Sequence, residues 1–158
     1  MSSISVRFAL PGEVNLIYKL IHQKAEFDRS IGAYKGTIQT NRQKIEQTIF
    51  SDHPFARVLF AEAGGEVMGF ALYGFRYSSF VGQPSIWLDD LYVETSQRSQ
   101  GAGSLLMSYL RDIAQKTNCT HIAWTADARN LRGLQFYDRI GAKIVNQQKY
   151  RCFFRWNL

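Results

Sequence analysis

The sequence from Trp87 to Ile113 reads WLDDLYV, ETSQ, RSQGAG and SLLMSYLRDI in turn. The first part is apolar and aromatic except for Asp89 and Asp90, which predicts a largely buried strand carrying two acids. The polar, glycine-containing middle is typical of a loop. In the last part, apolar side chains recur at i, i+3, i+4 and i+7, which predicts an amphipathic helix. Its expected inward residues are Leu106, Tyr109, Leu110 and Ile113.

The glycine loop has the properties of an anion-binding site. Backbone N–H groups are free to donate at a helix N-terminus, and the helix dipole favours negative charge there. Gly101 and Gly103 have no side chains, so a bulky anion could approach the backbone closely. The dinucleotide fingerprint and the G-x-x-x-x-G-K-[ST] loop are both absent. The pattern R-x-x-G-x-G therefore predicts a phosphate or pyrophosphate ligand, or else a helix start with small residues for close packing.

The composition favours one folded domain over residues 1–158, because 46% hydrophobic residues can fill a sizeable core. No apolar run approaches the ~20 residues of a membrane helix, and the N-terminus lacks a signal-peptide core. Cys119 and Cys152 lie far apart without C-x-x-C spacing, which is typical of reduced thiols. We therefore expect a cytoplasmic protein without a membrane partner.

The formal net charge of +6 suits either a small anionic ligand or nucleic acid. The basic residues are scattered singly, which favours the small anion over nucleic acid. The three histidines are isolated and lack metal-like spacing, so no metal site is expected.

Periodicity and turn signals predict an alternation of strands and helices along the chain. The expected strands cover residues 4–10, 57–63, 67–77, 87–93, 121–125, 142–146 and 150–156. The first helix should follow Pro11, a second should begin at an N-cap Thr40, and a last one should end at Arg139 before Gly141. Short turns make the three middle strands antiparallel, and helical crossovers imply parallel pairing. We expect a mixed α/β sheet with helices on both faces.

Five blocks between His53 and Lys143 resemble the diamine (spermidine/spermine) and thialysine acetyltransferase branch of the GNAT superfamily of N-acetyltransferases. They read HPF-ARVLFAE, GFALYGFRYSSFVG, WLDDLYV, RSQGAG and ARNLRGLQFYDRIGAK. The spacing from Asn130 to Tyr137 is more specific than the glycine loop. The resemblance implies a GNAT-like, mostly antiparallel sheet of about seven strands. It also implies an acetyl-CoA-dependent N-acetyltransferase and a homodimer, for which the amphipathic strand from Tyr150 to Trp156 is a candidate interface.

The same resemblance implies a place for each part of the cofactor. Backbone N–H groups from Arg98 to Gly103 would hold the CoA pyrophosphate, and the pantetheine would lie along the strand ending at Val93. Asn130 would contact the cofactor, and Tyr137 would lie near its sulfur. The expected cofactor-binding residues are Leu91, Tyr92, Val93, Arg98, Ser99, Gln100, Gly101, Ala102, Gly103, Ser104, Asn130 and Tyr137.

Two expected catalytic residues follow from the chemistry of acetyl transfer and the resemblance. An attacking amine must lose a proton, although a free alkylamine has a pKa of ~10.4. Asp89 stands where the family usually has Glu, and its shorter side chain favours proton removal through a water. Tyr137 would protonate the departing thiolate, with an aromatic core residue as its alternative role. On a regular strand Asp89 and Asp90 point to opposite faces, and a bulge would change this.

The expected acceptor-binding residues are Glu26, Ser78, Phe80, Asp89 and Asp90. Ser78 stands where the polyamine enzymes usually keep an acid that binds a distant ammonium. This departure predicts a short primary amine as acceptor, with spermine and spermidine as poor substrates. The alternatives are a peptide or protein amine, or a CoA-binding regulatory module without turnover.

Overall fold

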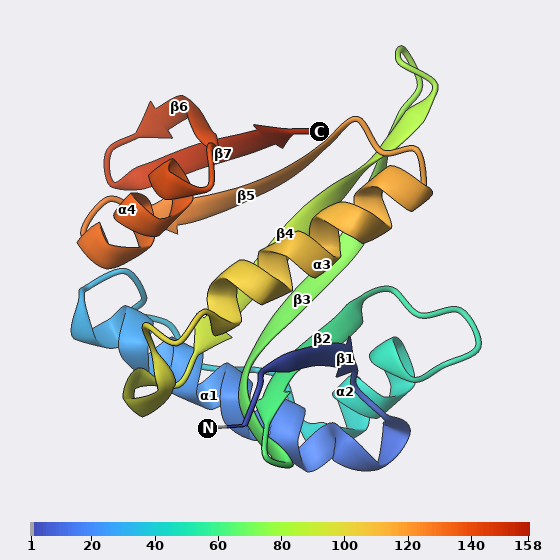
Figure 1. The fold of residues 1–158 in the computed structure, drawn as a ribbon, viewed down its shortest axis with the longest axis vertical. Helices are drawn as coiled ribbons and strands as arrows, with labels where there is room; N and C mark the ends of the chain where they lie inside the picture. Colours follow the sequence, from blue (N-terminus) through green and yellow to red (C-terminus); the bar gives the residue numbers. More distant parts are fainter. Residues whose placement is uncertain (1) are drawn as a thin grey trace.

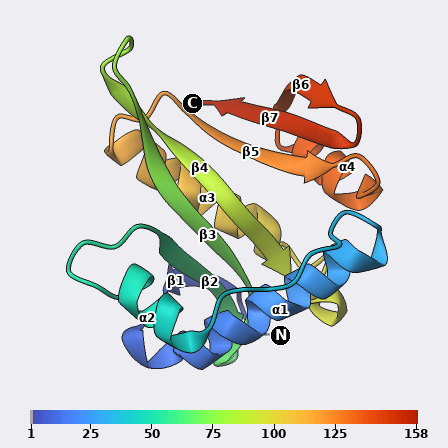
Figure 2. The same cartoon turned by 180° about the vertical axis from the view of Figure 1, so that it is seen from behind.

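The computed structural model describes residues 2–158, which form a seven-stranded sheet in the order β1-β2-β3-β4-β5-β7-β6 (Figures 1 and 2). The strands are β1 Ser5–Phe8, β2 Arg57–Ala63, β3 Glu66–Ser78, β4 Gln83–Val93, β5 His121–Asp127, β6 Lys143–Gln148 and β7 Arg151–Asn157. Neighbouring strands are antiparallel except for β4 and β5, which are parallel. The expected fold class is therefore confirmed.

Helices cover both faces of this sheet, and each face has its own hydrophobic core. The helices are α1 Val14–Ser30, α2 Arg42–Ile49, α3 Ala102–Lys116 and α4 Leu131–Arg139, with short 3-10 turns η1 Pro11–Glu13 and η2 Thr95–Gln97. α1 and α2 pack on the face seen in Figure 2, where Ile17 and Leu20 are fully buried. α3 packs on the face seen in Figure 1 through Leu106 and Leu110, as expected. Tyr109 and Ile113 are only partly buried there.

Two local predictions were wrong. The N-cap of α2 is Asn41 rather than Thr40, and its Oδ1 accepts a hydrogen bond of 2.8 Å from the Lys44 N–H. The predicted strands 67–77 and 87–93 leave residues 78–86 as a connection, but β3 runs to Ser78 and β4 begins at Gln83, so only residues 79–82 form the turn. The polar residues of this segment reflect exposure at the end of a long hairpin rather than the absence of a strand.

β4 contains a bulge at its two acids. Asp90 pairs with Leu72, while the next pair on β3 joins Tyr73 to Leu88, so Asp89 is the extra residue. Leu88 packs in the core beneath α3, whereas Tyr92 packs in the core beneath α1. The bulge therefore shifts the alternation of β4, so that the Asp90 side chain lies on the α1 side.

β4 and β5 separate soon after they pair, and the divergence is visible in Figure 1. Within residues 2–158, their register consists of Ile86 opposite Ile122 and Trp87 opposite Ala123. Beyond Trp87 the edge of β4 that faces β5 is no longer paired with that strand. The sheet is thus split beside the bulge.

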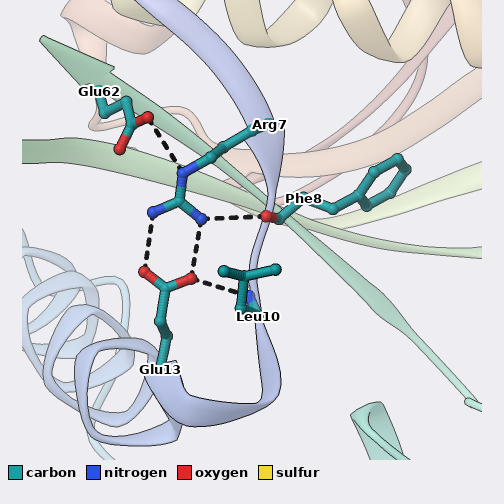
Figure 3. A network of polar contacts seen from close by, with 5 residues as sticks. All are labelled: Arg7, Phe8, Leu10, Glu13 and Glu62. Carbon is teal, nitrogen blue, oxygen red and sulfur yellow. Dashed lines mark hydrogen bonds and ion pairs between the residues drawn. The ribbon is translucent and has the colours of Figure 1, made fainter. Parts of the chain in front are cut away.

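A network around Arg7 ties β1 to η1 and β2 (Figure 3). Its guanidinium donates two hydrogen bonds of 2.8 Å to the Glu13 carboxylate and lies 3.1 Å from Glu62. Glu13 also accepts a hydrogen bond of 2.8 Å from the Leu10 N–H. The hydrogen bonds from Arg7 lower the pKa of Glu13, against the opposing effect of burial. The ionised carboxylate therefore stabilises the folded state.

We expect Glu13→Gln to lower the free energy of unfolding at pH 7 by about 1 kcal/mol. Because the pKa of Glu13 is lowered on folding, its contribution is full above the ordinary Glu pKa of ~4.3 and is lost as the pH falls below it. Urea denaturation at pH 7 and pH 3 measures both values. The matched control is Glu46→Gln on α2, and an equal loss in the two variants would contradict a specific role of the network.

Candidate active site

A cavity of about 1000 Å³ lies where β4 and β5 diverge. Its wall combines the diverging parts of β4 and β5, the start of α3, α4 and the C-terminal half of α1. Both layers of helices therefore reach this one space. The cavity wall includes all the expected cofactor-binding residues except Gln100, whose side chain turns toward Gln97.

The glycine loop leads directly into α3. Gly101 is the N-cap residue with φ of 94°, a backbone conformation that favours glycine. Because it has no side chain, no side-chain acceptor at this position occupies the N–H groups of the first turn. Ser99 also has a positive φ, of 65°. The loop therefore presents a helix N-terminus to the cavity, which is the arrangement that binds phosphate groups.

The Arg98 side chain fixes the glycine loop by contacts with β4 and α1. Its Nε donates a hydrogen bond of 2.9 Å to the Val93 carbonyl oxygen. The guanidinium lies 4.6 Å from the ring centre of Phe27 and 5.6 Å from that of Tyr92. Burial lowers the pKa of Arg98. The side chain thus anchors the loop to β4 and α1, which leaves the backbone as the part of Arg98 available to an anion.

Arg132 is a cavity residue that the sequence analysis missed. It projects from the first turn of α4 and donates a hydrogen bond of 2.6 Å to the Ser99 hydroxyl oxygen, so it bridges α4 and the glycine loop. The sequence could have indicated Arg132, because it follows Asn130 by two residues and so lies in the first turn of the helix that also carries Tyr137.

Asn130 is the N-cap of α4, and its Oδ1 accepts a hydrogen bond of 3.0 Å from the Gly133 N–H. A Cβ at Gly133 would lie 2.5 Å from the Asn130 side-chain nitrogen. Glycine at position 133 therefore makes room for the cap. The cap fixes the start of the helix that carries Tyr137.

Tyr137 lies in the hydrophobic core and also in the cavity wall. Its ring centre is 5.0 Å from that of Trp124 and 5.0 Å from that of Phe154. Burial raises the pKa of Tyr137 to about 12. The hydroxyl group therefore keeps its proton at neutral pH, and the packed ring holds it in a fixed position.

The two acids of β4 have different surroundings. Asp89 is exposed and lies in the cavity wall. Asp90 is partly buried, and its carboxylate lies 3.4 Å from the Lys24 ammonium, which also contacts Asp28 at 2.7 Å. Burial raises the pKa of Asp90 to about 6, against the opposing attraction of Lys24. For Lys24 burial acts to lower the pKa, but the attraction of Asp90 and Asp28 outweighs it, so the pKa is raised.

Lys24 and Asp28 were not anticipated, although both line the cavity. Their i, i+4 spacing puts them on one side of α1, as a continuation of the stripe through Ile17 and Leu20. The change from apolar to charged residues along this stripe could have indicated that the end of α1 faces a polar site. The contact of Lys24 with Asp90 depends on the bulge in β4.

Of the five expected acceptor-binding residues, only Asp89 lies in the wall of this cavity within one chain, while Asp90 lies behind it against Lys24. Glu26 is exposed, pairs with Arg29 and borders a second cavity on another side of α1. Two positions along a helix differ by about 200°, which separates Glu26 from Asp28. Ser78 and Phe80 lie at the tip of the β3–β4 hairpin, where Phe80 is fully exposed, because both strands extend farther than predicted.

Metal and membrane features are absent from the described part of the chain. Residues 2–158 contain no group of three or more His, Cys, Asp or Glu side chains placed to hold a metal ion. None of their helices combines the length and the apolar character that a membrane crossing needs.

Comparisons with known proteins agree with this geometry. The family described as acetyltransferase (GNAT) matches residues 20–142. Thialysine N-epsilon-acetyltransferase of Bos taurus is 28% identical over 97% of this chain and 92% of its own. Spermidine/spermine N(1)-acetyltransferase-like protein 1 of Homo sapiens is 26% identical over 99% of this chain and 23% of its own. The PaiA N-acetyltransferase of Thermoplasma acidophilum, solved in complex with coenzyme A, has a TM-score of 0.73 at 13% identity, with 99% of each chain covered.

The family match spans well over half of the chain and includes α3, the glycine loop and α4. The expected resemblance is confirmed by relatives of the same branch over nearly the full length. The chain belongs to the GNAT family of acetyltransferases and is an N-acetyltransferase that uses acetyl-CoA as its donor.

Proposed function

We propose that this enzyme moves the acetyl group from acetyl-CoA directly to a small primary amine, with both substrates bound at once. The observation that supports it most is the joint wall of the cavity. The glycine loop, Tyr137, Asp28 and Asp89 border the same space. Donor and acceptor could therefore meet there without a covalent enzyme intermediate.

In this proposal the donor lies along the loop and the split. The N–H groups from Arg98 to Gly103 bind the pyrophosphate, and Arg132 adds a positive charge beside Ser99. The pantetheine lies along β4 from Leu91 to Val93, where the edge facing β5 has no register with it in residues 2–158. The free backbone groups of this edge can bind its amides, and one N–H can stabilise the oxyanion.

The acids and Tyr137 would then divide the proton transfers. The amine nitrogen attacks the thioester carbon, and its proton passes through a water to Asp89, which is exposed to the cavity. The C–S bond breaks, and the thiolate receives a hydrogen bond and then a proton from Tyr137. Because the pKa of Tyr137 is about 12, above the ~8.5 of a simple thiol, we expect its hydrogen bond to act before the proton moves.

A small acceptor is supported by the thialysine acetyltransferase relative and by α1, which forms one side of the cavity. We also propose a homodimer. The strand that the sequence suggested as the interface, β7, lies inside the sheet between β5 and β6 and is not a free edge. β6 is a fully exposed edge strand, and Ile144 and Val145 are exposed on it, so a second copy could cover it. The cytoplasmic location stays a prediction from the sequence.

Thiol release from acetyl-CoA, measured with a panel of amines, tests the proposed function. We expect turnover with thialysine and other short primary amines, and a lower kcat/KM for spermine. The purified wild-type chain without amine is the control. Absence of amine-dependent thiol release across the panel, despite measurable CoA binding, would contradict the proposal.

We expect Tyr137→Phe to lower kcat by roughly 10²-fold or more, because it deletes the hydroxyl and keeps the packed ring. The measurement is turnover at saturating substrates, with circular dichroism as a check of folding. Phe136→Leu, which changes the adjacent aromatic residue without removing a proton donor, is the control. An unchanged kcat in Tyr137→Phe would remove the hydroxyl from the mechanism.

We expect Gly101→Val to weaken CoA binding, because a β-branched residue is strained at φ of 94° and puts atoms where the anion approaches. Calorimetric titration with CoA measures the loss. Gly65→Val is a matched control, since Gly65 has φ of 81° in the β2–β3 turn and equally open space for a Cβ. Equal CoA affinities for the two variants would contradict the assignment of the loop.

A further inference from the structure

Lys24 places a positive charge in the wall of the cavity on the side where the acceptor is proposed to bind. It belongs to α1, whose Phe27 and Asp28 also line this side, opposite the start of α3. Its ammonium contacts Asp28 at 2.7 Å and Asp90 at 3.4 Å. One lysine thus joins the helix to the bulged part of β4.

This cluster is held firmly. The side chains of Lys24, Asp28 and Asp90 are only 25%, 26% and 18% exposed. Their mutual contacts are much less screened than those of a surface pair, and separating them would leave charges without partners in a partly buried place. An incoming ligand would therefore meet Lys24 as a fixed part of the wall.

The three carboxylates near Lys24 differ in whether they already have a cation as partner. Asp28 and Asp90 both contact Lys24, while Asp89 forms no ion pair with any side chain from Ser2 to Leu158. The Arg98 guanidinium packs against the rings of Phe27 and Tyr92 and makes no ion pair with these acids. Asp28 and Asp90 thus share one ammonium, and Asp89 has no cation partner within the described residues.

We propose that Lys24 limits the class of acceptor: it occupies the place of a second ammonium group and so lowers the preference of the site for α,ω-diamines. This inference rests on the proposed function. A dication would bring one charge to Asp89 and a second toward Asp28 or Asp90, where the Lys24 ammonium repels it. The Lys24 ammonium, rather than Ser78, is then the reason to expect a low kcat/KM for polyamines, because Ser78 lies far along the hairpin.

The test compares two amines of equal length, 1-aminopentane and 1,5-diaminopentane, by the ratio of kcat/KM for the diamine over the monoamine. We expect this ratio to rise about tenfold from the wild type to Lys24→Met, equivalent to ~1.4 kcal/mol. A general loss of stability or of CoA binding affects both amines alike and leaves the ratio unchanged. Lys19→Met is the matched control, because Lys19 is on the same helix but outside this cavity.

Two further variants keep the inference testable if Lys24→Met folds poorly. Lys24→Gln removes the charge but keeps a polar side chain, and it should also raise the ratio. Asp28→Asn leaves Lys24 with one acid fewer, so we expect the ratio to fall below that of the wild type. An unchanged ratio in all folded variants of an active enzyme would overturn the role of Lys24, and an inactive wild type would overturn the proposed function together with this inference.

Discussion

The short parallel pairing of β4 and β5 is the constraint on which the rest of the molecule depends. Two residue pairs hold these strands together near Ile86 and Trp87, and then the sheet opens. A continuous ladder would have placed β5 against the acids of β4 and closed the space that α4 and α1 now border. The unpaired edge and the cavity are therefore two results of the same split.

The bulge at Asp89 determines which acidic side chain of β4 faces the cavity and which faces α1. It shifts the alternation of β4 by one residue, so Asp90 faces α1 and meets Lys24, while Asp89 remains exposed to the cavity. Without the bulge, one of these acids would have to lie in the apolar core beneath α3, where an unpaired carboxylate is costly. A local irregularity of one strand thus gives two neighbouring acids two different environments.

Sequence reasoning succeeded where structure is determined locally. The stretch from Trp87 to Ile113 carries its own strand, loop and helix signals, and the Asn130 to Tyr137 spacing falls on a single short helix. It failed where a position depends on distant partners. The contact of Lys24 with Asp90 requires both the bulge and the packing of α1. Ser78 was assigned by resemblance to the polyamine enzymes, and within one chain the length of β3 carries it to the hairpin tip, away from the cavity.

The partly buried Arg98 side chain has a consequence for how binding in one part of the cavity would affect the other. Its guanidinium lies over Phe27 of α1 while its Nε holds the Val93 carbonyl beside the glycine loop, so one side chain belongs to both halves of the cavity. Any shift of α1 on filling one half changes the packing of the other. Such energetic coupling is reciprocal, so each substrate would alter the affinity for its partner by the same factor.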